Sequence, residues 1–186
     1  MHKTVQNIIL GRNKLCLLDL DHTLIYGSYA PTEKTELLFE HSQYLKVYKR
    51  PFVEEFIDFL NHFYTHIIVY TTAKKDYANR ICNDLGIHAL KILTRQDCKQ
   101  KNNTYYKMFK SEWAKTYNSI HIVDDSPNVW LDTEYYDKQI TFVVPKEFRG
   151  EADDMELLKL KELIKNIQIL SKKVRLHSLL LHGIIP

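Results

Sequence analysis

The sequence contains little of the material from which linkers and disulfide frameworks are built. Its 186 residues include only 5 glycines and 5 prolines, and no low-complexity stretch or internal repeat is present. The 3 cysteines, Cys16, Cys82 and Cys98, are widely spaced and form no CxxC pair. This pattern argues against a disulfide framework or a zinc site, and it favours reduced thiols in a cytoplasm.

A strong net charge and a long apolar run are also lacking. Lys and Arg number 26 against 23 for Asp and Glu, and the formal net charge of +3 is too small to predict nucleic acid as the main partner. Residues 1–14 hold only a three-residue apolar stretch at 8–10, so we expect neither a signal peptide nor a transmembrane segment. With 45% hydrophobic residues, the chain can bury a full core, and we predict one soluble domain over residues 1–186.

Apolar runs with the length of buried strands recur along the chain, and helical patterns separate several of them. The runs cover residues 15–18, 66–70, 89–93, 119–123 and 140–144. Strands that alternate with helices indicate an α/β fold with a mostly parallel central sheet covered on both faces. Ligands of such sheets bind outside the carboxyl ends of the strands, so we expect the functional residues there.

The spacing of apolar residues predicts three helices between these strands. They cover residues 51–64, 74–85 and 106–117. The first helix would bury an aromatic face that includes Phe52. The second would end before Gly86, and we expect this glycine to form a left-handed cap. The third would begin next to Lys107.

Two further segments fall outside this alternation. Residues 36–40 and 44–48 predict a small β-hairpin within an insertion at 26–49 that follows the first strand and is too short to form a lid domain. Residues 153–180 predict a C-terminal helical segment whose amphipathic part, 155–174, closes over the sheet. A basic helix on a membrane surface is the less common alternative for such a pattern.

Two aspartates follow the first predicted strand directly. Because side chains alternate along a strand, Asp19 and Asp21 are expected to point the same way, while Leu20 turns back into the core. Such a pair suits an enzyme in which one carboxylate attacks and the other transfers protons. Taken alone, the motif fits an ordinary solvated strand end equally well.

More polar residues lie at the ends of other predicted elements. Thr71 and Thr72 follow the second strand, Asp124 and Asp125 follow the fourth, and Lys107 lies near the start of the third helix. Carboxylates within about 5 Å of one another repel by roughly 3 kcal/mol per pair at an effective dielectric near 20, so the cluster requires a cation. All-oxygen ligands indicate Mg²⁺. The cation, the lysine and a threonine hydroxyl together could neutralise a phosphoryl group, which predicts phosphoryl transfer.

In this order the motifs resemble those of the haloacid dehalogenase superfamily of phosphatases. More narrowly, the chain is similar to the phosphatases of the RNA polymerase II C-terminal domain and their small nuclear and membrane-associated relatives. The matching segments are 49–52, 70–73, 95–98, 104–107, 123–127 and 153–155, and the likeness extends from about residue 14 to residue 180. The resemblance implies a three-layer α/β/α fold without a large cap domain.

The resemblance also implies the catalytic residues. Asp19 would be the nucleophile that forms an aspartyl-phosphate, and Asp21 would protonate the leaving oxygen and then activate a water molecule. Thr71 and Lys107 would hold the phosphate, with Thr72 beside them.

Metal and substrate contacts follow from the same resemblance. The Mg²⁺ ligands would be Asp19, the backbone carbonyl of Asp21, Asp124 and Asp125. Tyr77 and Arg95 would lie at the substrate groove. From the residues alone, a tyrosine on a helix face and a surface arginine explain these two positions equally well.

We therefore predict a Mg²⁺-dependent phosphoprotein phosphatase that acts on phosphoserine and phosphothreonine or on phosphotyrosine. The absence of a large cap leaves the site open to a polypeptide. Two alternatives stay open: a small-molecule or nucleotide phosphatase, and a binding module that kept the fold without catalysis. The expected partner is a phosphorylated protein or peptide, and the expected location is the cytoplasm, or that of a host cell if the source is a pathogen.

Overall fold

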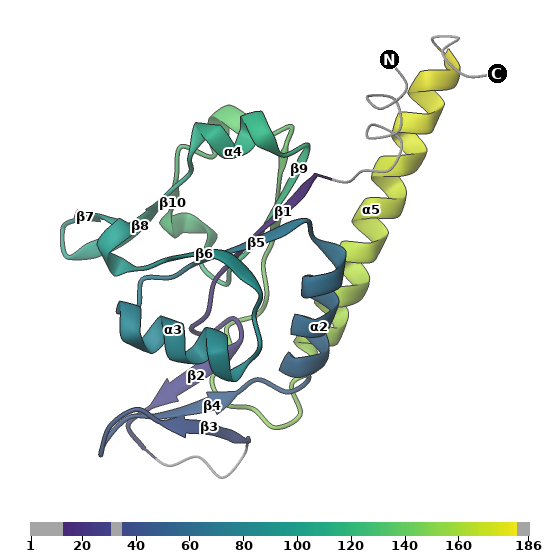
Figure 1. The fold of residues 1–186 in the computed structure, drawn as a ribbon. Coiled ribbons are helices and arrows are strands. Elements are labelled where there is room, and N and C mark those ends of the chain that lie inside the picture. The colour runs from purple at the N-terminus through teal and green to yellow at the C-terminus, as the bar shows by residue number, and fades with distance from the viewer. Residues whose placement is uncertain (1–12, 31–34, 182–186) are drawn as a thin grey trace.

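The computed structural model describes residues 13–30 and 35–181, with side chains of the last helix up to residue 170. A parallel sheet forms its centre, in the order β11-β9-β1-β5-β6 (Figure 1). Its strands are β1 (Lys14–Leu18), β5 (His66–Tyr70), β6 (Ala89–Leu93), β9 (Ser119–Val123) and β11 (Ile140–Val143). The predicted α/β class and the predicted strands are confirmed.

The register of the sheet brings the carboxyl ends of its middle strands level with one another. Leu18 at the end of β1 lies opposite Val69 of β5 and Val123 of β9. The pairing continues one residue further, because the backbone N–H of Asp19 donates to the carbonyl of Val123 at 2.9 Å. Residues that follow these strands therefore meet at one edge of the sheet.

Helices cover the two faces of the sheet unequally. Helices α2 (Val53–Phe63), α3 (Lys75–Asp84) and α5 (Glu156–Leu181) pack with Cys16 and Leu18 on one face. The short helix α4 (Ser111–Thr116) packs with Leu15 and Leu17 on the other. This alternation along β1 is the pleat of a strand that is buried on both sides.

The C-terminal helix closes the first of these faces, as the amphipathic pattern predicted. Leu157, Leu160 and Ile164 are buried in the core that α2 and α5 share, and the two helices lie side by side in Figure 1. Among the residues that the structure describes, no helix has the length and apolar character needed to cross a membrane. Residues 1–12, most of the segment in which we expected no signal peptide, lie outside that description.

A small antiparallel sheet follows β1 at the carboxyl edge. It consists of β2 (Ile25–Ser28), β3 (Leu37–Glu40) and β4 (Lys46–Lys49), in the order β2-β4-β3. The hairpin predicted after the first strand is present as β3 and β4. Strand β2 extends it to three strands.

A second small sheet occupies the residues where the third helix was predicted to begin. It contains β7 (Lys99–Lys101), β8 (Thr104–Met108) and β10 (Trp130–Leu131), so Lys107 lies on a strand and α4 begins only at Ser111. The reason is the turn between β7 and β8. Asn102 and Asn103 both adopt positive φ, 49° and 61°, as the two central residues of a tight hairpin turn require.

The start of the first predicted helix is also corrected. Phe52 has a left-handed backbone (φ 65°) and is 38% exposed, so it precedes α2 and does not belong to the buried aromatic face. Phe56 of that face is buried as predicted. At the end of α3, Gly86 has φ 65°, which confirms the predicted left-handed cap.

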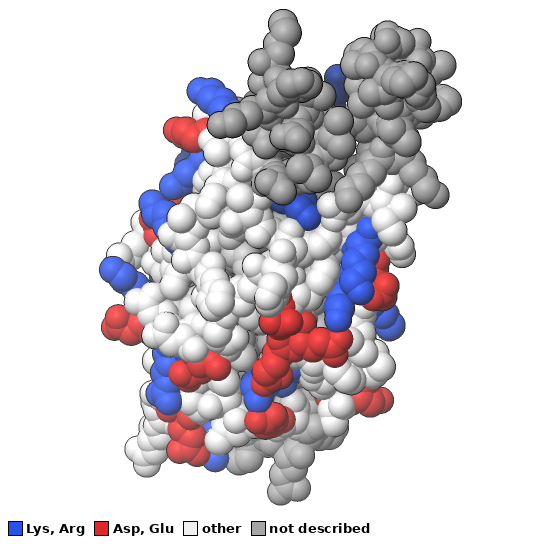
Figure 2. Space-filling model, turned by 45° about the vertical axis from the view of Figure 1, so that its right-hand side comes forward, with Lys and Arg blue, Asp and Glu red and all other residues white. Residues whose placement is uncertain are grey.

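Surface charges of opposite sign lie beside one another. Figure 2 shows acidic and basic side chains interspersed over one face of the molecule. Lys49 contacts Glu36 at 2.6 Å and Glu54 at 2.5 Å, and Lys161 contacts Glu55 at 2.6 Å. Because an exposed pair contributes at most about 1 kcal/mol, the fold depends mainly on its core.

Candidate active site

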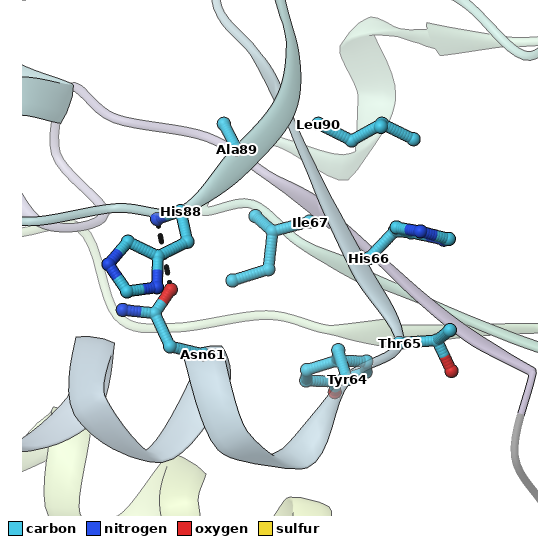
Figure 3. A pocket seen from close by; sticks show the side chains of 8 residues that line it. All are labelled: Asn61, Tyr64, Thr65, His66, Ile67, His88, Ala89 and Leu90. Carbon is cyan, nitrogen blue, oxygen red and sulfur yellow. Dashed lines mark hydrogen bonds between the residues drawn. The ribbon is translucent and has the colours of Figure 1, made fainter.

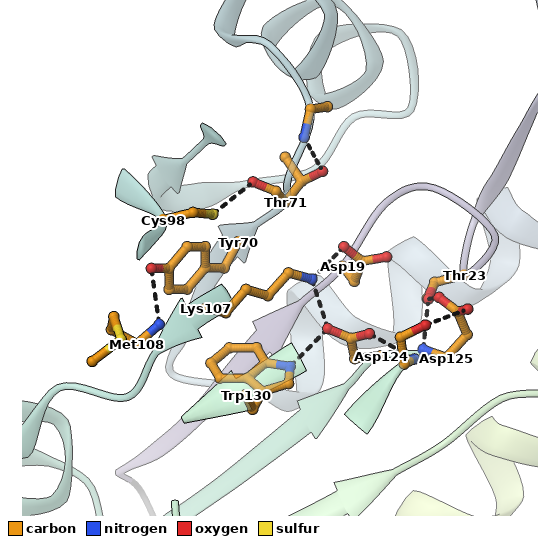
Figure 4. A network of polar contacts seen from close by, with 12 residues as sticks. Asp19, Thr23, Tyr70, Thr71, Cys98, Lys107, Met108, Asp124, Asp125 and Trp130 are labelled. Carbon is orange, nitrogen blue, oxygen red and sulfur yellow. Dashed lines mark hydrogen bonds and ion pairs between the residues drawn. The ribbon is translucent and has the colours of Figure 1, made fainter. Parts of the chain in front are cut away.

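Three carboxylates converge at the carboxyl edge of the sheet (Figure 4). Asp19 follows β1, and Asp124 and Asp125 follow β9. One carboxylate oxygen from each of the three lies within 4.8 Å of the other two. Asp19 and Asp124 are buried, and Asp125 is partly exposed.

Lys107 reaches this group from β8 and is only 2% exposed. Its Nζ lies 2.5 Å from Asp19 Oδ1 and 2.6 Å from Asp124 Oδ2. Burial alone would lower the pKa of the Lys107 ammonium, but the two aspartates raise it above its ordinary value. Lys107 is therefore a fixed positive charge between two carboxylates.

The charge of the site fits a divalent cation. Burial raises the pKa of Asp19 well above its ordinary value, although Lys107 lowers it and Asp124 raises it further. Burial and the neighbouring Asp124 likewise raise the pKa of Asp125. One lysine balances one of the three negative charges, and a divalent ion would balance the other two. The oxygen-only donor set is the one that Mg²⁺ prefers.

Hydrogen bonds between the loops after β1 and β9 orient these carboxylates. The hydroxyl of buried Thr23 donates to Asp125 Oδ1 at 3.3 Å and accepts from the backbone N–H of Asp125 at 3.2 Å. Ser126 donates its hydroxyl to Asp125 Oδ2 at 3.1 Å and its backbone N–H to Asp124 Oδ1 at 2.9 Å. The indole N–H of Trp130 donates to Asp124 Oδ2 at 2.7 Å. The positions of both aspartates are thus fixed from several sides.

Asp21 is not one of the three clustered carboxylates, but its charge lies close enough to raise the pKa of Asp19. Strand β1 ends at Leu18, and its pairing continues only to the N–H of Asp19, so the common direction of Asp19 and Asp21 stays a prediction. Asp21 instead accepts a hydrogen bond from the hydroxyl of Tyr77 on α3 at 3.1 Å. Burial raises the pKa of the Asp21 carboxyl, and the bond from Tyr77 opposes this shift.

Tyr77 is 8% exposed and turns its hydroxyl toward Asp21. Gly27 of β2 provides the room, because a Cβ at that position would lie 3.3 Å from the hydroxyl oxygen. The contact of Tyr77 with substrate stays a prediction.

Thr71 lies at the end of β5, near Lys107 and Asp19 in Figure 4. It is buried, and its hydroxyl accepts the backbone N–H of Ala73 at 3.1 Å. The carbonyl of Thr72 accepts a hydrogen bond from Arg95 Nε at 2.8 Å. The exposed guanidinium of Arg95 lies 5.0 Å from the ring centre of Tyr105. The predicted phosphate and substrate positions therefore share one edge of the sheet.

Sequence reasoning missed three residues that hold the site together. Trp130 bonds Asp124, Tyr70 links β5 to β8 through the N–H of Met108 at 3.1 Å, and Arg50 contacts the loop after β1. Arg50 lay in a segment quoted for the resemblance, but its sequence position alone indicates nothing about its partners.

A pocket of about 360 Å³ lies at the opposite edge of the sheet (Figure 3). Its walls include His66 at the start of β5 and Ala89 at the start of β6. The side chain of Asn61 accepts the N–H of His88 there at 3.0 Å. Because it adjoins the amino ends of the strands, this pocket is separate from the aspartates.

Comparison with known proteins places the site in context. Residues 14–175 match the family model described as NLI interacting factor-like phosphatase. The chain is 27% identical over 164 residues to an RNA polymerase II C-terminal domain phosphatase of Caenorhabditis elegans, covering 80% of this chain and 23% of that protein. It is 29% identical over 163 residues to a probable C-terminal domain small phosphatase of Dictyostelium discoideum, covering 83% and 50%. The chain thus spans half or less of the length of these two relatives.

Solved structures agree on the fold. The structure of Fcp1, an essential RNA polymerase II CTD phosphatase, is similar with a TM-score of 0.52 and 19% identity, over 96% of this chain and 56% of that one. A fission yeast Fcp1 variant bound to beryllium fluoride gives a TM-score of 0.51 and 17% identity, over 98% and 59%.

Proposed function

The chain belongs to the NLI interacting factor-like phosphatase family, and from this premise we propose that it is a Mg²⁺-dependent phosphoprotein phosphatase. It would hydrolyse phosphoserine and phosphothreonine or phosphotyrosine through an aspartyl-phosphate on Asp19. One observation carries the proposal. Oδ1 of buried Asp19, directly after the central strand, lies 2.5 Å from Nζ of buried Lys107, and Asp19 clusters with Asp124 and Asp125.

In the first step, a carboxylate oxygen of Asp19 attacks phosphorus, and the bond from phosphorus to the ester oxygen breaks. The leaving oxygen takes a proton from Asp21, which must therefore begin the reaction protonated. Burial supports this because it raises the pKa of that carboxyl. Asp21, now ionised, then takes a proton from water, and the resulting attack on phosphorus releases phosphate and frees Asp19.

The remaining residues of the site would bind the phosphoryl oxygens and the ion. Lys107 and Thr71, which lie near each other in Figure 4, would hold the phosphoryl group, together with Thr72, the next residue in the chain. The ligands of Mg²⁺ would be Asp19, the backbone carbonyl of Asp21, Asp124 and Asp125. When bound, the ion supplies positive charge that offsets the negative charges of the carboxylates and the phosphoryl oxygens.

A polypeptide substrate is favoured by what surrounds the site. Among the described residues, the only sheet inserted between β1 and α2 is the small one of β2, β3 and β4. Arg95 is exposed beside Thr72 and forms no ion pair with a described carboxylate. We propose that Arg95 and Tyr77 border the substrate groove, and that the protein works in a cytoplasm, in keeping with its free cysteines.

Hydrolysis of an aryl phosphate tests the proposal. We expect turnover with Mg²⁺, none with EDTA, and none in Asp19→Asn, whereas Asp153→Asn, at an exposed acid outside the site, keeps full activity. An inactive native protein would favour the non-catalytic binding module.

A substrate panel tests the finer assignment. Phosphopeptides carrying phosphoserine, phosphothreonine or phosphotyrosine are compared with nucleotides and sugar phosphates at equal concentration. Higher kcat/KM for the small metabolites would contradict the phosphoprotein assignment and favour the small-molecule alternative.

A further inference from the structure

Arg50 is a charged residue with 1% exposure that lies between β4 and α2. Its Nε and Nη2 donate to Oδ1 and Oδ2 of Asp154, both at 2.9 Å. Two parallel hydrogen bonds of this kind form the strongest and most directional pairing of arginine with a carboxylate. The pair joins the segment before α2 to the segment before α5.

The other donors of Arg50 bind main-chain carbonyls of two loops. Nη1 donates to the carbonyl of Thr23 at 3.0 Å and more weakly to that of His22 at 3.4 Å, and Nη2 donates to the carbonyl of Lys146 at 2.8 Å. The backbone N–H of Arg50 also donates to the carbonyl of Leu24 at 3.0 Å. A single side chain, with its own backbone, thus holds three consecutive peptide units of the loop after β1.

The backbone held in this way is strained. His22 has φ 62°, a backbone conformation that residues other than glycine adopt only rarely. Such a conformation persists only where its surroundings determine it. Here the carbonyl of His22 also accepts the N–H of Phe148 at 2.8 Å, and the loop at 146–148 is itself tied to Arg50 through Lys146.

The same loop carries residues of the site. His22 separates Asp21 from Thr23, and the Thr23 hydroxyl orients Asp125. At the far end of the pair, Asp154 Oδ1 accepts the backbone N–H of Glu156, the first residue of α5. The start of the C-terminal helix is therefore connected to the site through one ion pair.

We infer that Arg50 and Asp154 form a clamp that holds the loop of residues 20–24 in its reactive position, so that turnover depends on the segment that begins α5. The inference rests on the proposed phosphatase function. Both residues are positioning residues, because their contacts are to the backbone of the loop and to each other.

The test uses variants that weaken the clamp in different ways. Arg50→Lys keeps the charge but loses the forked geometry, and Asp154→Asn keeps the shape but loses the charge. The double variant Arg50→Met, Asp154→Leu removes both charges, so that no buried charge is left unpaired. Matched controls are Asp153→Asn and Arg149→Lys, at exposed neighbours with no bond to the loop of residues 20–24.

Two readouts are taken well below the unfolding temperature of each variant. For aryl phosphate we expect kcat to fall roughly tenfold to a hundredfold in all three clamp variants while KM stays close to native, since small displacements of reacting groups have effects of this size. Amide hydrogen exchange should rise about tenfold or more at His22, Leu24 and Phe148, whose N–H groups bond within the clamped loops, and not at β5.

Native exchange at these amides in Arg50→Lys and Asp154→Asn would overturn the clamp. Faster exchange with native kcat would also overturn it, because the loop would then be held without any effect on the reaction. An inactive native protein would count against the proposed function instead, and the exchange rates would still decide whether the pair fixes the loop.

Discussion

At the scale of single residues, the site depends on how one lysine is shared. Lys107 is the cation within hydrogen-bond distance of both Asp19 and Asp124, and it is buried with them. Its charge serves the protein before any phosphate arrives, by offsetting repulsion between carboxylates. A phosphoryl group entering the site would receive the same ammonium as a partner.

Lys107→Ala is therefore expected to slow catalysis without weakening metal binding. Loss of a charge-assisted contact to the transferred phosphate should lower kcat/KM about a hundredfold or more. Affinity for Mg²⁺ should not fall, because the variant removes a positive charge from beside the carboxylates. Kinetics on aryl phosphate and calorimetric titration with Mg²⁺ measure the two effects, with Lys110→Ala as the control. A near-native kcat/KM would show that Lys107 does not contact the phosphate.

The buried side chain of His121 on β9 should make the stability of the protein depend on pH. It is buried against the hydroxyl of Tyr64, which lies 2.6 Å from Nδ1, and burial, with a smaller effect of Lys14, lowers its pKa from 6.5 to about 4. Between these values the unfolded chain binds a proton that the folded protein does not. The free energy of unfolding should therefore fall on acidification, by about 2 kcal/mol at pH 5 from this group.

Urea unfolding at pH 7 and pH 5 measures this loss. In His121→Gln the loss of unfolding free energy between pH 7 and pH 5 should be about 2 kcal/mol smaller than in the native protein. In the control His62→Gln, at an exposed helix position, the loss should equal that of the native protein. Equal losses in the native protein and in His121→Gln would contradict the assignment.

Strand ends made part of the site predictable at this scale. Asp19, Asp124 and Asp125 could be placed together because parallel strands end at a common edge. The partners of Arg50 could not, since Thr23 and Asp154 lie 27 and 104 positions away in the chain and only folding brings them near. The common direction of Asp19 and Asp21 stays a prediction, because strand β1 ends at Leu18.

At the scale of elements, helix α2 begins under backbone strain. Phe52 immediately precedes it with φ 65°, where a side chain costs roughly 1–2 kcal/mol relative to glycine. The chain thus enters α2 through a conformation that its own residue disfavours.

A pair of substitutions isolates this strain from the contacts of the ring. Phe52→Gly should be more stable than Phe52→Ala by about 1 kcal/mol, because both variants lose the ring and only glycine relieves the backbone. At Phe59, inside α2, the order should reverse by about 0.5–1 kcal/mol. Thermal unfolding of the four variants measures both differences. Equal stability of the two variants at Phe52 would mean that the left-handed backbone costs nothing there.

The elements show which sequence signals were sufficient. Strands β5 and β9 match their predicted bounds because apolar runs of this length suit buried parallel strands. Strand β6 also matches, although it is an edge strand with Leu90 exposed. The end of β8, residues 106–108, was read as the start of a helix, although Asn102-Asn103 before it adopts the positive φ angles of a hairpin turn. The helical pattern after it is real, but it begins only at Ser111.

At the scale of the whole molecule, the three clustered carboxylates would couple binding of the proposed Mg²⁺ to stability. They come from strands that are held together only in the folded sheet, so Mg²⁺ should bind the folded chain in preference to the unfolded one. At a hundred times its dissociation constant, the ion should add about 2.7 kcal/mol. For a chain of 186 residues this corresponds to a rise in Tm of roughly 5–10 °C.

Thermal unfolding with Mg²⁺ and with EDTA measures the shift independently of any activity. Asp125→Asn should reduce it, and Asp153→Asn should leave it unchanged. A Tm that is the same with Mg²⁺ and with EDTA would argue against a metal site formed by Asp19, Asp124 and Asp125.

The central place of β1 in the sheet has a consequence for how the protein is made. Thr23 and Asp125 are 102 positions apart, and the pairing of β1 with β9 is what brings their loops together. A ribosome synthesises the amino-terminal half first, and at about 5–20 residues per second the second half follows only several seconds later. During that time Asp19, the nucleophile of the proposed reaction, is present without Asp124 and Asp125, so the nascent polypeptide should stay inactive until translation has passed these two residues.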